Sequence, residues 1–149
     1  LKEKYVPLTA EAIENAPEEE LLEGVALGLQ LFLQKQENDE KEFEALSDAK
    51  KFIYILDILE SDKTLGNFFR SNSPILKTRL VPALEAIGVT RRLSEIKRIA
   101  LMFDDRDETV SFSEKEIAAL DEKLSDEGLL SEIKLAGAKY IKENPKMFI

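Results

Sequence analysis

The stretch PEEELLEGVALGLQLFL, from Pro17 to Leu33, decides the fold of this chain. Proline is well tolerated at the start of a helix, and the glutamates that follow it place negative charge at the positive end of the helix dipole. The apolar residues then recur every three or four positions, which is the spacing of one helical face. They are Leu21, Leu22, Val25, Ala26, Leu29, Phe32 and Leu33. The stretch therefore predicts an amphipathic helix whose apolar face lies on a core.

The same spacing recurs along the rest of the chain, and no run alternates for long enough to predict a strand. VSF (110–112) is the one candidate for short strand pairing. A length of 149 residues and a hydrophobic fraction of 44% suit one domain with a buried core. We predict an all-α, single-domain bundle of about seven or eight helices over residues 1–149. Beside the helix at 17–34, helices are expected near 9–15, 48–59, 76–87, 90–103, 113–124 and 129–144.

Several residues mark the expected helix ends. The predicted N-caps are Thr9, Asp48, Thr90 and Ser113, the last in a capping box with Glu116. Gly88 suits a helix C-terminus, and Pro82 predicts that the helix before Gly88 starts late or is kinked. Gly24 and Gly28 predict the close approach of a neighbouring helix.

Two segments are interpreted as connections between helices. QENDEKEFEALSD (36–48) is charged, and SDKTLGNFFRSNSP (61–74) is rich in turn-forming residues. Within the second segment, Phe68 and Phe69 are expected to anchor a turn on the core.

The chain contains neither histidine nor cysteine. A Ser-His-Asp or Cys-His catalytic site and a thiolate zinc site are therefore excluded within this chain. No glycine-rich phosphate loop is present either. We expect a protein that is not an enzyme and has no cofactor and no metal site. The lack of cysteine is compatible with a cytoplasmic location, which we expect, and no apolar run is long enough to predict a membrane span.

DDRDETVSFSEKE (104–116) has two interpretations. With Asp105 at loop position one, Asp107 falls at three and Glu116 at twelve, as in an EF-hand calcium loop. Position six is then Val110, where the loop needs the positive φ of glycine. Ser113 and Glu116 are also explained as a helix cap. We therefore favour a polar hinge over a calcium site.

The net charge of −9 is unevenly distributed. Residues 1–62 carry −10, residues 63–103 carry +6, and residues 104–149 carry −5. One interpretation is internal compensation, in which basic helices pack beside acidic ones. The other is an acidic surface that attracts a basic partner and repels nucleic acid.

Three segments carry a resemblance to a known family. LGNFFRSNSP (65–74), PALEAIGV (82–89) and AKYIKENPKMF (138–148) resemble, in this order, a family of small helical bacterial proteins typified by a dimeric DNA-mimic protein. The family motif in the first segment maps onto Gly66, Asn67, Phe68, Phe69 and Asn72. The chain departs from it in three places: Thr64-Leu65-Gly66 replaces an Asn-Gly-Gly triplet, Asn67 replaces a glutamine, and Asn72 comes one residue later than the family asparagine.

The resemblance implies a homodimeric protein whose carboxylates imitate DNA phosphates. Such a protein would occupy a basic partner protein, for example a DNA-binding protein. Such carboxylates would satisfy the Lys and Arg side chains that otherwise bind phosphate. The partner-binding candidates are Glu18, Glu19, Glu20, Glu23, Asp39, Glu40, Glu42, Glu44, Asp104, Asp105, Asp107 and Glu108. No direct contact with nucleic acid or membrane is expected.

Two other functions stay open from the sequence. The chain could be a structural or assembly module without a DNA-binding partner. It could also bind a small ligand, with the segment from Gly66 to Asn72 as one wall of a pocket.

Overall fold

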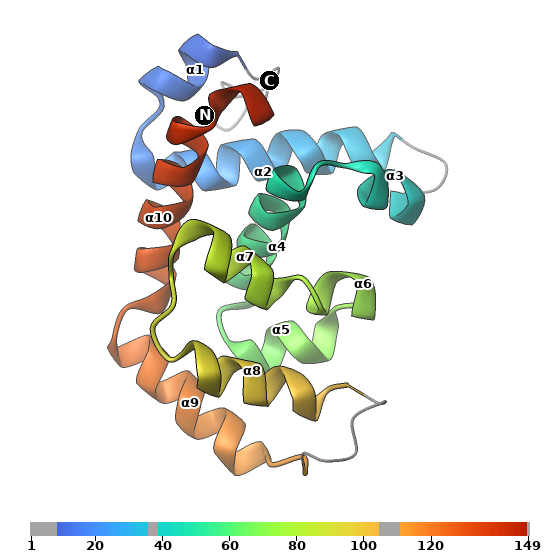
Figure 1. Cartoon of the computed structure of the whole chain (residues 1–149), viewed down its shortest axis with the longest axis vertical. Helices are drawn as coiled ribbons and strands as arrows, with labels where there is room; N and C mark the ends of the chain where they lie inside the picture. Colours follow the sequence, from blue (N-terminus) through green and yellow to red (C-terminus); the bar gives the residue numbers. More distant parts are fainter. Residues whose placement is uncertain (1–8, 36–38, 105–110, 149) are drawn as a thin grey trace.

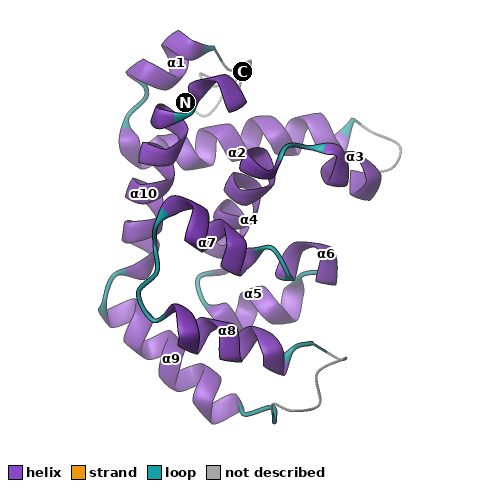
Figure 2. Ribbon diagram, viewed as in Figure 1, coloured by secondary structure: helices purple, strands orange, loops and turns teal. Residues whose placement is uncertain are grey.

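A computed structural model describes residues 9–35, 39–104 and 111–148. These residues form α-helices and no strand, which confirms the all-α prediction (Figure 2). The assignment of the whole chain to one domain stays a prediction. The helices are α1 (Ala10–Asn15), α2 (Glu18–Gln34), α3 (Asp39–Ala45), α4 (Asp48–Asp62), α5 (Leu65–Ser71), α6 (Pro74–Lys77), α7 (Leu80–Ile87), α8 (Leu93–Met102), α9 (Glu114–Asp126) and α10 (Leu129–Glu143), followed by the 3-10 turn η2 (Pro145–Met147).

The helices are arranged along one long axis (Figure 1). Helices α1, α2 and α3 lie at one end together with the C-terminus, and α8 and α9 lie at the other end. Helix α10 runs along one edge between the two ends and packs against α2. Helix α4 contacts α2, α5 and α7, so it occupies the centre of the bundle.

One hydrophobic cluster extends from Ile13 in α1 to Phe148 after η2. The apolar face predicted for residues 17–33 supplies Leu21, Leu22 and Val25 to this cluster, and all three are buried. Phe32 was wrongly assigned to that face, because 44% of it is exposed. The buried residues of α2 lie on one side of the helix, and the opposite side contacts solvent.

Two predicted caps are confirmed and two are wrong. The Thr9 hydroxyl accepts a hydrogen bond from the Ala12 N–H at 3.0 Å, and the Ser113 hydroxyl accepts one from the Glu116 N–H at 3.2 Å. Helix α4 is capped by Ser47 rather than by Asp48, which lies in the first turn. Helix α8 follows Arg92, whose φ is +56°, and Thr90 is not its cap.

The helices outnumber the prediction because the two segments interpreted as connections are helical in part. The charged segment 36–48 contains α3, which buries Phe43. The segment 61–74 contains α5, which begins after a Thr64 cap and buries both phenylalanines of the Gly66–Asn72 motif. Local composition favoured turns in both places, but burial of these rings outweighs local preference.

Of the two outcomes predicted for Pro82, a late helix start and a kink, the structure shows the late start. The expected helix before Gly88 is divided into α6 and α7, and Pro82 is the third residue of α7. The missing N–H of Pro82 costs no hydrogen bond there, because the first N–H groups of a helix have no intrahelical partner. Gly88 ends α7 with a φ of +79°, where a side chain is disfavoured.

Candidate functional site

The acidic surface is the first candidate site. Arginines of the basic middle segment, residues 63–103, form ion pairs with part of it. Each arginine of residues 63–103 forms an ion pair with a glutamate, and most of these glutamates belong to the acidic flanks. The cross-segment pairs are Arg70–Glu114, Arg79–Glu44, Arg91–Glu132, Arg92–Glu127 and Arg98–Glu116. This pattern supports internal compensation for this part of the surface.

Arg92 makes the most extensive of these contacts. Its Nε and Nη2 donate to the two carboxylate oxygens of Glu127 at 2.7 and 3.0 Å, and its Nη1 donates to Glu95 at 2.9 Å. The hydrogen bond from Arg92 holds the pKa of Glu127 below its ordinary value, and the two carboxylates raise the pKa of Arg92. A fork of this geometry fixes the start of α8 against the end of α9.

This contact predicts a specific acid sensitivity. Because the folded-state pKa of Glu127 is lowered, its contribution to stability is present above its ordinary pKa of 4.5 and is lost as pH falls through the folded value. We expect Glu127→Gln to flatten the fall in melting temperature below about pH 5. Glu122→Gln, an exposed site on the same helix, should leave the wild-type pH profile intact. Equal pH profiles for wild type and Glu127→Gln would contradict this assignment.

The predicted partner-binding acids differ in ion pairing and in exposure to solvent. Glu44 accepts a hydrogen bond from Arg79 at 2.5 Å, so it is compensated. Glu19 and Glu23 line a polar cavity of about 200 Å³ that also holds Lys63 and Lys134. The rest fall into three groups: exposed Glu18 and Glu40; half-buried Glu20, Glu42 and Asp104; and Asp39, which begins α3. Asp105, Asp107 and Glu108 lie outside the described residues, as does the first half of the calcium-loop candidate, 105–110.

Four exposed carboxylates stand apart from the compensated ones. Glu11 and Glu14 on α1, and Glu18 and Glu19 at the start of α2, form no ion pair within 4.0 Å with any residue that the structure describes. No lysine or arginine occurs between Thr9 and Gln34. We call this set the α1–α2 carboxylates. Glu11 and Glu14 are not among the acids that the sequence singled out, although their spacing on one short helix is visible in it.

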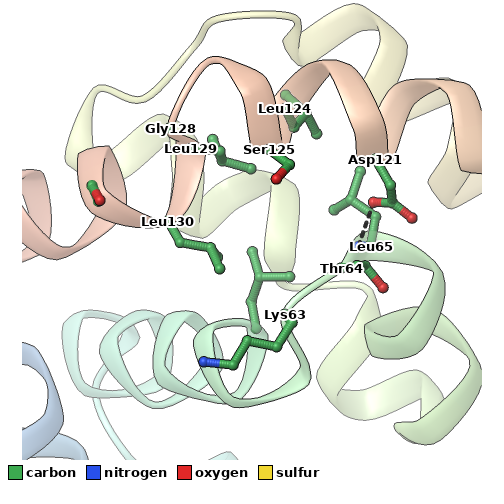
Figure 3. A pocket seen from close by; sticks show the side chains of 11 residues that line it. Lys63, Thr64, Leu65, Asp121, Leu124, Ser125, Gly128, Leu129 and Leu130 are labelled. Atoms are coloured by element: carbon green, nitrogen blue, oxygen red, sulfur yellow. Dashed lines mark hydrogen bonds between the residues drawn. The ribbon is translucent and has the colours of Figure 1, made fainter.

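The Gly66–Asn72 motif is the second candidate, and its contacts are structural. The carboxylate of Asp121 on α9 accepts hydrogen bonds from the N–H groups of Leu65 (2.7 Å) and Gly66 (3.1 Å), and Figure 3 shows the first of them. A Cβ at residue 66 would meet Asp121 and Ile117 at 3.3 Å. Arg70 Nη1 would lie closer still, at 3.0 Å, so a side chain at this position would have to displace its neighbours from α5 and α9. Sequence reasoning missed Asp121, because it lies 55 residues away from Gly66.

The two asparagines of the motif also bond within the protein. The Asn67 side chain donates to the Asp62 carbonyl at 3.0 Å. The Asn72 side chain donates to the Asp62 carboxylate at 2.9 Å and to the Phe68 carbonyl at 2.8 Å. Both amides thus fasten α5 to the end of α4.

The cavity beside this motif is small. It has a volume of about 180 Å³ and is lined by residues such as Leu59, Leu65, Asp121 and Leu129 (Figure 3). Ligand pockets usually measure roughly 300–1,000 Å³. Its one carboxylate is already occupied by two backbone N–H groups. These contacts give no support to a ligand site at this segment.

The described part of the chain contains no helix with the length and apolar character of a membrane span. Within the same residues, no three Asp or Glu side chains are grouped as ligands for a metal ion. Comparison of the chain with family models, curated proteins and solved structures gave no match. The resemblance to the DNA-mimic family therefore stays a prediction.

Proposed function

We propose that this protein is a non-enzymatic binding protein whose α1–α2 carboxylates contact a basic surface of a partner protein. The observation that supports this best is the contrast between the two acidic regions. At least one glutamate on each of α3, α8, α9 and α10 is held by an arginine, whereas Glu11, Glu14, Glu18 and Glu19 are exposed without an ion pair to the described residues. Exposed like charges at one end of a molecule steer oppositely charged partners toward that end.

The test compares capture of proteins from the source lysate at low and at raised salt. The triple variant Glu11→Gln/Glu14→Gln/Glu18→Gln removes three charges and keeps side-chain size. Glu85→Gln/Glu122→Gln/Asp126→Asn removes three charges from other exposed positions and serves as the matched control. Both variants are checked by thermal melting, because Glu11 and Glu18 lie in first helical turns, where carboxylates are stabilising.

We expect a basic protein to be captured by wild type and by the control variant, to be released at raised salt, and to be lost from the Glu11/Glu14/Glu18 variant. Equal capture by both variants would refute the proposed surface. A chain that captures no basic protein at either salt concentration would instead be a structural or assembly module.

DNA mimicry is the narrower form of this proposal. It requires that double-stranded DNA displaces the captured partner, because mimic and DNA would share one basic surface. The pairing of Glu44 with Arg79 removes one of the carboxylates from such a display. A homodimer, and a cytoplasmic location, also remain part of the proposal, and the molar mass in solution tests the first of them.

A further inference from the structure

A larger cavity lies away from the α1–α2 carboxylates, where the basic middle segment folds. Its volume is about 710 Å³, which is within the range of roughly 300–1,000 Å³ for ligand pockets. Phe69 and Phe103 form its floor, and their rings stack with centroids 5.3 Å apart and planes at 15°. The helices around it are α5, α6, α7 and α8, which lie on one side of the molecule in Figure 1.

The first wall is a row of residues at helical spacing. Pro74, Lys77, Thr78 and Val81 line the cavity from α6, the following turn and α7. Their positions are i, i+3, i+4 and i+7, which is the spacing of one helical face. The helix is interrupted between α6 and α7, but both turn residues, Thr78 and Arg79, have right-handed backbone angles.

The second wall has the same spacing. Lys97, Ala100, Leu101 and Asp104 line the cavity from α8 and the two residues after it. Each wall thus spans seven steps of about 1.5 Å, or roughly 10 Å, which is about two helical turns. Two rows of this kind over an apolar floor form a groove, the type of site that takes the apolar face of a helix.

The edge of the groove keeps apolar side chains in contact with solvent. Leu101 is 38% exposed and Phe112 is 51% exposed, and the Phe112 ring lies edge-on to Phe103 at 5.3 Å. A bound acyl chain would cover the floor but would leave these rim residues in water. A helix lying along the groove would cover the floor and the rim together, which favours a protein segment over a lipid.

The charge of the groove specifies the segment further. Each wall carries one lysine, and the second wall also carries Asp104, seven positions after Lys97. Neither Lys77 nor Lys97 forms an ion pair with the described residues, although the arginines of the same segment all do. The Lys77 ammonium lies 5.8 Å from the centre of the Phe103 ring. Carboxylates on both sides of an apolar stripe would meet one lysine on each wall.

We propose that this groove binds an acidic amphipathic helix of a partner protein, with about two turns of its apolar stripe on Phe69 and Phe103. This site is separate from the α1–α2 carboxylates. It would bind a negatively charged segment, whereas those carboxylates would bind a positively charged surface. One chain would then bind a basic surface at one end and an acidic helix at another place.

The test uses synthetic peptides of about 16 residues, long enough to form a helix. The first has leucines at i, i+4, i+7 and i+11 with flanking glutamates. A second replaces the glutamates by lysines, and a third has the first composition with its leucines scattered around the helix. Sodium decanoate is the lipid-like probe. Binding to the full chain is followed by fluorescence anisotropy of labelled peptides and by calorimetry.

We expect the acidic amphipathic peptide to bind at least tenfold more tightly than either peptide control. Leu101→Glu should weaken its binding at least tenfold, whereas Leu135→Glu, at an exposed leucine of α10, should not. Lys77→Gln/Lys97→Gln should weaken it about two- to thirtyfold, the range for two exposed ion pairs. Lys115→Gln/Lys146→Gln, at exposed positions elsewhere, is its control.

The lysine variants keep the test valid if Leu101→Glu lowers the stability of the fold. Equal binding of the acidic and basic peptides would overturn the proposal. So would equal effects of the groove and control variants, or binding of decanoate in the groove without binding of the peptide.

Discussion

Asp121→Ala is expected to destabilise the protein by about 3 kcal/mol, because two backbone N–H groups lose a charged acceptor. Those of Leu65 and Gly66 belong to the first turn of α5, and both residues are buried. For a chain of this size the change corresponds to a fall in melting temperature of roughly 6–12 °C.

Two variants distinguish this role of Asp121 from a general effect of charge. Glu122→Ala removes the adjacent, exposed carboxylate of the same helix and should change stability by less than about 0.5 kcal/mol. Asp121→Asn keeps one carbonyl acceptor and should lose about half as much stability as Asp121→Ala. A loss for Asp121→Ala no larger than that for Glu122→Ala would show that the Asp121 contact is unimportant.

The sequence predicts those parts of the fold that depend on periodicity and on local caps. Helices α2 and α10 are long enough for their apolar spacing to identify them, and Thr9 and Ser113 cap helices through residues three positions away. Such signals need no knowledge of the rest of the chain.

Short helices were missed because tertiary contacts stabilise them. Helix α5 has seven residues, too few to be stable alone, and it depends on Asp121 from α9 and on burial of Phe68 and Phe69. Nothing local in the turn-rich segment predicts these partners. The same applies to α3, which is held by Phe43.

The candidate sites also have parts that the sequence predicts and parts that depend on tertiary contacts. Summing charges along the chain indicates an acidic, a basic and an acidic segment, but it cannot say which carboxylates meet which arginines. Arg92 and Glu127 are 35 residues apart and are paired only by the packing of α8 on α9. The groove also escaped notice, because its two walls come from separate helices and its lysines look like ordinary surface charge in the sequence.

Gly137→Val is expected to destabilise the protein by about 2 kcal/mol, because α10 and α2 lie too close there for a branched side chain. A Cβ at residue 137 would already lie 3.1 Å from Cδ1 of Leu22, which is 1% exposed. The sequence predicts the approach of a neighbouring helix at Gly24 and Gly28 of α2, but it does not single out Gly137 on α10, which packs against α2.

Comparing Gly137→Ala with Gly137→Val separates crowding against Leu22 from the effect of helix propensity on stability. Gly137→Ala gains about 1 kcal/mol of helix propensity, which offsets a shift of a few tenths of an ångström by Leu22 and leaves stability nearly unchanged. Ala136→Val, at the half-buried neighbouring position, measures the intrinsic cost of a β-branched residue in α10, about 0.5 kcal/mol. If chemical denaturation gave equal losses for valine at 136 and at 137, helix propensity alone would explain both, and the close approach of α2 to α10 would carry no energetic weight.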